Sequence, residues 1–141
     1  MKVADILHSK GNNVFSVKGD ITVYEALKIM GEKNIGALLV MEDEVLEGII
    51  SERDYARKII LKGKTSHETL VKEIMTEKVI TVMPEDDIEK CMNLMSGKRI
   101  RHLPVTKEDR VVGVISITDV VTAIIEMQKN TITQLENYIS G

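Results

Sequence analysis

An internal repeat constrains the fold of this chain more than any other feature. Shifting the sequence by 65 residues aligns residues 14–59 with 79–124 without a gap, and 12 of the 46 aligned pairs are identical. The stretch "GIISERD" at 48–54 returns as "GVISITD" at 113–119, with its glycine, serine and aspartate retained. The segment before each copy, which we call the lead-in, is also repeated: "VADIL" beginning at Val3 corresponds to "VKEIM" beginning at Val71. We therefore expect two copies of one supersecondary unit, neither of which is stable alone.

Within each copy the hydrophobic periodicity changes in a fixed order. The pattern predicts a strand, a helix, two strands joined by an acidic turn, and a second helix after the serine. The fold class is therefore α/β (α+β), with two βαββα repeats whose sheets pack on each other. A polar connection at 61–70 divides the chain into a first repeat, 1–63, and a second, 64–141, which ends in a helical tail. The predicted segments are strands at 14–17, 35–40, 45–50, 79–82, 100–105 and 111–116, and first helices at 20–34 and 85–99.

Composition excludes several classes of protein. A single cysteine among 141 residues rules out an intrachain disulfide, the longest apolar run, at 35–41, is far shorter than a membrane span, and the N-terminal segment does not build the apolar core of a signal peptide. We expect a cytoplasmic protein with no membrane partner. The net charge of −3 and the aromatic content of 3% argue against a nucleic-acid binder, which would carry a basic surface or platforms for base stacking.

Catalytic and metal-binding patterns are not found in the sequence. Neither repeated serine has a histidine partner nearby in sequence, and no GxGxxG or P-loop pattern occurs. We expect Cys91 to be a core residue, and His8 and His67 to lie on the surface. We therefore predict no enzyme activity and no metal. The repeated SxxD motif has two readings, a capping box at a helix start or part of a ligand site, and these readings are compatible.

The tandem βαββα repeat, closing each time on glycine, two apolar residues and SxxD, resembles a pair of CBS domains, the module named after cystathionine beta-synthase. The resemblance covers nearly the whole chain and includes "IRHLPV" at 100–105. It implies two repeats related by a pseudo-twofold axis, usually forming a homodimer, in a stand-alone two-CBS protein. It also implies an adenosine ligand, AMP foremost, with ADP, ATP, NAD or S-adenosylmethionine as alternatives, and a regulated partner protein of unknown identity.

The resemblance further implies two ligand clefts between the repeats. Asp54 and Asp119 match the positions that accept ribose hydroxyls, and basic residues would meet a phosphate. Arg101 and His102 replace Gly36 and Ala37 of the first repeat, so the clefts are not expected to be equivalent. Protonation of His102, with an ordinary pKa of about 6.5, would strengthen anion binding on mild acidification. One predicted cleft comprises Val114, Ser116, Thr118 and Asp119 with Phe15, Ile35 and Gly36, and the other comprises Ser51, Arg53 and Asp54 with Ile80, Ile100, Arg101 and His102.

Three functions remain open from the sequence. The leading hypothesis is an adenine-nucleotide sensor that modulates a partner when ligand binds. The second is a constitutive dimeric assembly module, in which the clefts are vestigial and the SxxD motifs act only as caps. Arg101 and His102 have an alternative reading of their own, as a solvated strand end. The third, a small nucleotide-modifying enzyme, has no supporting set of catalytic residues.

Overall fold

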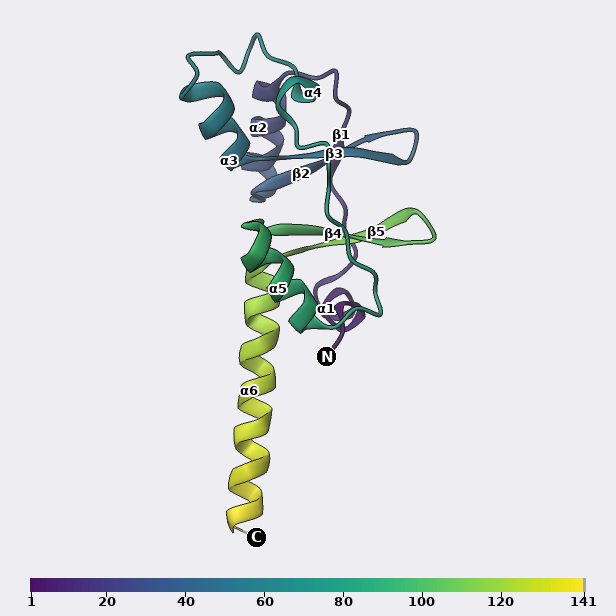
Figure 1. The fold of residues 1–141 in the computed structure, drawn as a ribbon, viewed down its shortest axis with the longest axis vertical. Coiled ribbons are helices and arrows are strands. Elements are labelled where there is room, and N and C mark those ends of the chain that lie inside the picture. Colours follow the sequence, from purple (N-terminus) through teal and green to yellow (C-terminus); the bar gives the residue numbers. More distant parts are fainter. Residues whose placement is uncertain (141) are drawn as a thin grey trace. The chain divides into compact units, whose positions relative to one another are not determined.

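A computed structural model describes residues 1–140 and divides the chain into two compact units (Figure 1). One unit is Val14–Ile80, and the other combines Met1–Asn13 with the chain from Thr81 onwards. The first unit contains the predicted order of helices and strands, the second contains it without the strand predicted at 79–82, and the α+β class is confirmed. The elements are α1 (Val3–Lys10), β1 (Ser16–Val17), α2 (Val23–Lys33), β2 (Ala37–Glu42), β3 (Val45–Ser51), α3 (Glu52–Tyr55), the π-helical segment η1 (Ala56–Ile60), α4 (Val71–Ile74), α5 (Ile88–Lys98), β4 (His102–Lys107), β5 (Arg110–Ser116) and α6 (Ile117–Ser140).

The central elements of the two units correspond residue by residue. Helices α2 and α5, and the hairpins β2–β3 and β4–β5, begin and end 65 positions apart. Both helices end at a residue in the left-handed region, Asn34 with φ of 55° and Arg99 with φ of 54°. Each hairpin turns through two acidic residues with positive φ, which gives the twist that a two-residue turn needs to join antiparallel strands.

The sheets of the two units differ at the strand before the first helix. In the first unit β1 lies parallel to β2, and the N–H of Leu39 donates to the carbonyl of Phe15 at 3.2 Å. The predicted strand at 79–82 is reduced to one parallel bridge between Val82 and Val105. The position that corresponds to Leu39 is Pro104, which has no N–H to donate, so the ladder does not extend further along β4.

The two lead-in helices, α1 and α4, dock in the same way. The first N–H groups of α1, from Val3 and Ala4, donate at 2.9 Å to carbonyls in the loop before α5. Those of α4, from Val71 and Lys72, donate at 2.9 Å to the corresponding carbonyls before α2. These bonds satisfy N–H groups that a helix start leaves without intrahelical partners. Helix α1 therefore belongs to the unit of the second repeat and α4 to that of the first, so the compact units differ from the segments 1–63 and 64–141.

A glycine in each unit allows the lead-in segment to pack closely against the sheet. A Cβ atom on Gly48 would lie 2.8 Å from the backbone oxygen of Thr76, and one on Gly113 would lie 2.6 Å from the Cδ2 atom of Leu7. Retention of both glycines in the repeat thus has a packing reason. The apolar core of the first unit is formed by Val23, Ala26, Met30, Leu38, Val40, Ile50, Ile59, Val71 and Ile74.

The second helices of the two repeats are unlike. After Ser51 the chain forms four residues of α3 and the five of η1, and it turns at Gly63 with φ of 69°. After Ser116 a single helix, α6, runs for 24 residues, and Figure 1 shows it continuing beyond α5. None of the helices within residues 1–140 combines the length and the apolar character that crossing a bilayer requires.

Candidate functional site

Both SxxD motifs form helix caps. The Ser51 N–H donates to Asp54 Oδ2 at 2.9 Å, and the Asp54 N–H donates to Ser51 Oγ at 3.3 Å. In the second repeat the Ser116 N–H donates to Asp119 Oδ2 at 2.8 Å, and the Asp119 N–H donates to Ser116 Oγ at 3.2 Å. The predicted capping role is confirmed, and it fixes the position of one carboxylate at the end of β3 and one at the end of β5.

The starts of these helices offer fewer backbone donors than a bare helix terminus. The N–H of Glu52 already donates to the Gly36 carbonyl at 3.1 Å, and the N–H of Ile117 donates to the Arg101 carbonyl at 2.8 Å. With the serine caps, two of the first three N–H groups of each helix are used within the protein. An anion at this position would therefore depend mainly on side chains.

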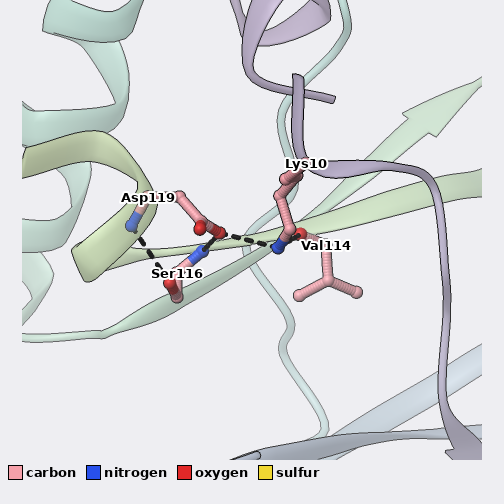
Figure 2. Close-up of polar contacts among 4 residues, drawn as sticks. All are labelled: Lys10, Val114, Ser116 and Asp119. Atoms are coloured by element: carbon pink, nitrogen blue, oxygen red, sulfur yellow. Dashed lines mark hydrogen bonds and ion pairs between the residues drawn. The ribbon is translucent and has the colours of Figure 1, made fainter. Parts of the chain in front are cut away.

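Asp119 is paired with a lysine from α1 (Figure 2). The ammonium of Lys10 lies 2.7 Å from Asp119 Oδ2 and also donates to the carbonyl of Val114 at 2.9 Å. Ser116 N–H and Lys10 bind the same carboxylate oxygen, so neither of them engages Oδ1. Lys10 thereby joins the last residue of α1 to both β5 and the start of α6.

Asp54 is also paired with a lysine, but this lysine lies in η1 and not in a lead-in helix. Lys58, one turn further along the same segment, places its ammonium 3.2 Å from Asp54 Oδ1 and donates to the Ile74 carbonyl of α4 at 2.7 Å. Ser51 binds the other oxygen through its N–H and its hydroxyl. Both carboxylate oxygens of Asp54 are thus engaged, whereas the Ser116 and Lys10 donors leave Oδ1 of Asp119 available.

Electrostatics distinguish the second repeat. Burial alone would raise the pKa of Asp119, but the hydrogen bonds from Lys10 and from the Ser116 N–H outweigh it, and the net pKa is lowered. This carboxylate is ionised at neutral pH. The pKa of His102 is lowered by burial, although the charge of Asp119 opposes that effect. The lowered pKa counts against the prediction that mild acidification protonates His102, because the half-buried ring takes up a proton less readily than a free imidazole.

The structure gathers some of the predicted site residues within each unit. His102 pairs with Ser116 across the β4–β5 ladder, as Ala37 pairs with Ser51 across β2–β3, so the strand starts lie beside the SxxD motifs. Phe15 is 37% exposed, and the ammonium of Lys33 lies over its ring, 5.5 Å from the ring centre. Exposed side chains at the site are those of Phe15, Arg53, Arg101 and Thr118. The first unit contains Phe15, Ile35, Gly36, Ser51, Arg53, Asp54 and Ile80, and the second contains Ile100, Arg101, His102, Val114, Ser116, Thr118 and Asp119.

Lys58 and Lys10 are both site residues that the sequence analysis missed, and Lys10 had the weaker local signal. Lys10 is separated from Asp119 by 109 positions, and no local motif connects them. The only available signal was the repeat of the lead-in, in which Lys10 corresponds to Lys78. Lys10 and Asp119 also line a hollow of about 190 Å³ beside α1 and α6.

Comparison with known proteins identifies the family. The family model described as "CBS domain" matches twice, at residues 3–61 and 71–126. The chain therefore belongs to the CBS-domain family and contains two CBS repeats.

Particular relatives narrow this class to stand-alone CBS-pair proteins. The chain is similar to the CBS domain-containing protein CBSX3, mitochondrial, of Arabidopsis thaliana, with 43% identity over 99% of this chain and 72% of that protein. It is similar to a solved CBS-domain structure from Burkholderia ambifaria MC40-6, described in connection with signal transduction, with 45% identity, a TM-score of 0.87, and coverage of 89% and 95% of the two chains. The CBS domain pair of MJ0100, solved with 5′-methylthioadenosine and S-adenosyl-L-methionine, shares 28% identity with a TM-score of 0.78 over 90% of this chain and 98% of that one.

Proposed function

We propose that this chain is a non-enzymatic regulatory CBS pair that binds an adenosine derivative, AMP foremost, and thereby changes the activity of a partner protein. ADP, ATP, NAD and S-adenosylmethionine are alternative ligands of the same class. The proposal includes the cytoplasmic location and the homodimer expected from the sequence. Regulation then requires that the ligand bind two states of the protein unequally, since a ligand shifts an equilibrium only by its difference in affinity.

The observation that carries the proposal is the ionised carboxylate at the start of α6. Asp119 is held by its own cap, and Oδ1 is left available by the Ser116 and Lys10 donors. An ionised carboxylate can accept hydrogen bonds from vicinal ribose hydroxyls, as acidic residues do in dinucleotide-binding folds. The MJ0100 pair, which is similar over 90% of this chain, was solved with two adenosine compounds, and this supports the same ligand class here.

We assign the stronger site to the second repeat. At Asp54 a ribose would have to displace either Lys58 or the Ser51 donors, because these engage both oxygens. At Asp119 one oxygen can accept a hydroxyl before any existing bond breaks. Arg101 also belongs to the unit that contains Asp119, and its carbonyl accepts from the Ile117 N–H at the start of α6, so its exposed side chain can provide positive charge for a phosphate there.

Thermal shift with a panel of adenosine compounds tests the proposal against a constitutive assembly module. A ligand present at about 100 times its dissociation constant should stabilise the protein by about 2.7 kcal/mol. We expect AMP to raise the melting temperature, and cytidine monophosphate, the matched control with another base, to leave it unchanged. If no adenosine compound shifts the melting temperature at millimolar concentration, the SxxD motifs are caps only and the assembly-module hypothesis is preferred.

A further inference from the structure

The second half of α6 has no packing partner in the described chain. Val120 and Ala123 near its start are buried, whereas every residue from Met127 to Ser140 is exposed. At 1.5 Å per residue, the 24-residue helix is about 36 Å long, and more than half of that length is without contacts that bury its side chains. Isolated helices of fewer than about 12–15 residues are marginal in water, and helices in proteins are held mainly by packing of an apolar face.

Five of the exposed apolar residues of α6, together with Gln128, follow a heptad, whereas Met127 and Tyr138 are exposed outside it. Starting from Val121 they are spaced alternately four and three residues apart, which places them on one stripe of the helix. The exposed fraction of these side chains rises along the helix, from 40% at Val121 to 82% at Ile139. A hollow of about 410 Å³ is lined by Gln128 and Ile132 of this stripe and by the neighbouring Ile124, Met127 and Thr131. We call the stripe the seam; it consists of Val121, Ile125, Gln128, Ile132, Leu135 and Ile139.

The residue types in the seam specify a second copy of the same helix. Isoleucine occupies the three a positions and Leu135 one of the d positions, the pairing that favours a parallel two-stranded coiled coil, while Val121 and Gln128 occupy the other two d positions. In a parallel pair the same residue of each copy meets across the axis. Gln128, the polar d residue, would then face its own counterpart and hydrogen bond to it, which fixes the register.

Charges beside the seam favour the parallel arrangement. In a parallel pair Lys129 lies beside Ile124 of the second copy, and Glu136 lies beside Thr131, so no like charges meet. An antiparallel pair with all seam residues covered would place Lys129 of one copy beside Lys129 of the other. Like charges in contact disfavour that alternative.

We propose that the seam is a dimer interface, in which two copies of this chain pair their α6 helices as a parallel coiled coil. This interface is independent of nucleotide binding. It buries the apolar side chains of the seam, and it supplies the packing that the second half of α6 otherwise lacks.

Sedimentation equilibrium of the full chain tests the interface. We expect the native protein to be a dimer at about 10 μM, and Ile132→Lys with Leu135→Lys to raise the dissociation constant on the order of 100-fold or more, because two buried layers are lost and four lysines meet. Both side chains are more than half exposed in the single chain, so the variant should fold. The matched control, Asn130→Lys with Asn137→Lys, adds the same charge on the opposite face and should remain a dimer. A native monomer, or a seam variant that dimerises as tightly as the control, would overturn the proposal.

Cysteine crosslinking tests the parallel register. Gln128→Cys should form an interchain disulfide under mild oxidation, because like d positions face each other in a parallel pair, whereas Asn130→Cys on the outer face should not. The native Cys91 is fully buried and does not interfere. Equal crosslinking of the two variants would overturn the parallel coiled coil.

Discussion

Replacing Lys10 by methionine should reduce the preference of the Asp119 site for AMP over adenosine. The change keeps the length of the side chain and removes the ammonium that binds Asp119 Oδ2 at 2.7 Å and the Val114 carbonyl at 2.9 Å. In the native protein this ammonium competes with a ribose hydroxyl for Oδ2, and it also neutralises a carboxylate that would repel a phosphate. Its loss should therefore act in opposite directions on adenosine and AMP, provided that the proposed site is correct.

The size of the effect follows from the exposure of the pair. Lys10 and Asp119 side chains are 38% and 21% exposed, and ion pairs of this kind contribute roughly 0.2–1 kcal/mol. Freeing Oδ2 should thus tighten adenosine binding about 3-fold. For an assumed separation of about 6 Å between the ammonium and the phosphate, Coulomb's law gives about 1.4 kcal/mol at an effective dielectric constant of about 40, so AMP should lose about 10-fold from the missing charge. With the gain at Oδ2 included, AMP affinity should fall about 3-fold and the ratio of the two affinities about 10-fold.

Isothermal titration calorimetry of both ligands at about 0.1 M salt measures this ratio, since screening at that ionic strength acts over about 10 Å. Lys78→Met is the matched control, because it removes the same charge from the exposed residue that corresponds to Lys10. If Lys10→Met changes adenosine and AMP affinity by the same factor, Lys10 has no selective role. If the native protein binds neither ligand, the proposed function itself fails.

Three further predictions concern stability and reactivity. Gly48→Ala should destabilise the protein by about 1–3 kcal/mol in urea unfolding, and Gly113→Ala by less, because the first Cβ meets backbone and the second meets a side chain that can move; equal losses would contradict this. Because folding lowers the pKa of His102, the unfolded chain binds the proton more readily than the folded protein below about pH 6.5. The free energy of unfolding should therefore fall between pH 7 and 5, and it should fall less in His102→Gln. A variant with the native pH profile would refute the assignment. Burial raises the pKa of Cys91 to about 11, so iodoacetamide at pH 8 should label it only on unfolding; rapid labelling of the folded protein would contradict its position in the core.

The repeated parts of the fold were predictable because they are specified locally. Hydrophobic periodicity indicates α2 and α5, and the SxxD spacing indicates the caps at Ser51 and Ser116. The strand at 79–82 was overpredicted because periodicity does not register that Pro104, on the neighbouring strand, lacks the required N–H. The second helices differ because η1 ends at Ile60, before a turn in which Gly63 has a positive φ, whereas no such turn interrupts α6.

The site was predictable only where a motif carries it. Asp54 and Asp119 are visible in the sequence because each lies three residues after its serine. The lysines that pair with these two aspartates do not occupy corresponding positions in the two repeats. Lys58 lies in the same segment as Asp54, whereas Lys10 is more than a hundred residues from Asp119. Only the fold shows which carboxylate oxygen each lysine binds. The lowered pKa of His102 likewise results from burial, which strand periodicity does not specify.

The most direct test of the central claim is calorimetry of AMP with the native protein and with Asp119→Ala, and Asp54→Ala is the matched variant in the other repeat. The account predicts that the native protein binds AMP and that Asp119→Ala weakens binding by about 30- to 150-fold, equivalent to 2–3 kcal/mol for a lost charged acceptor. The same variant should lose only on the order of 1 kcal/mol of unfolding free energy, the usual contribution of a cap. Unchanged AMP affinity in a destabilised Asp119→Ala protein would contradict the account, because Asp119 would then be a cap alone.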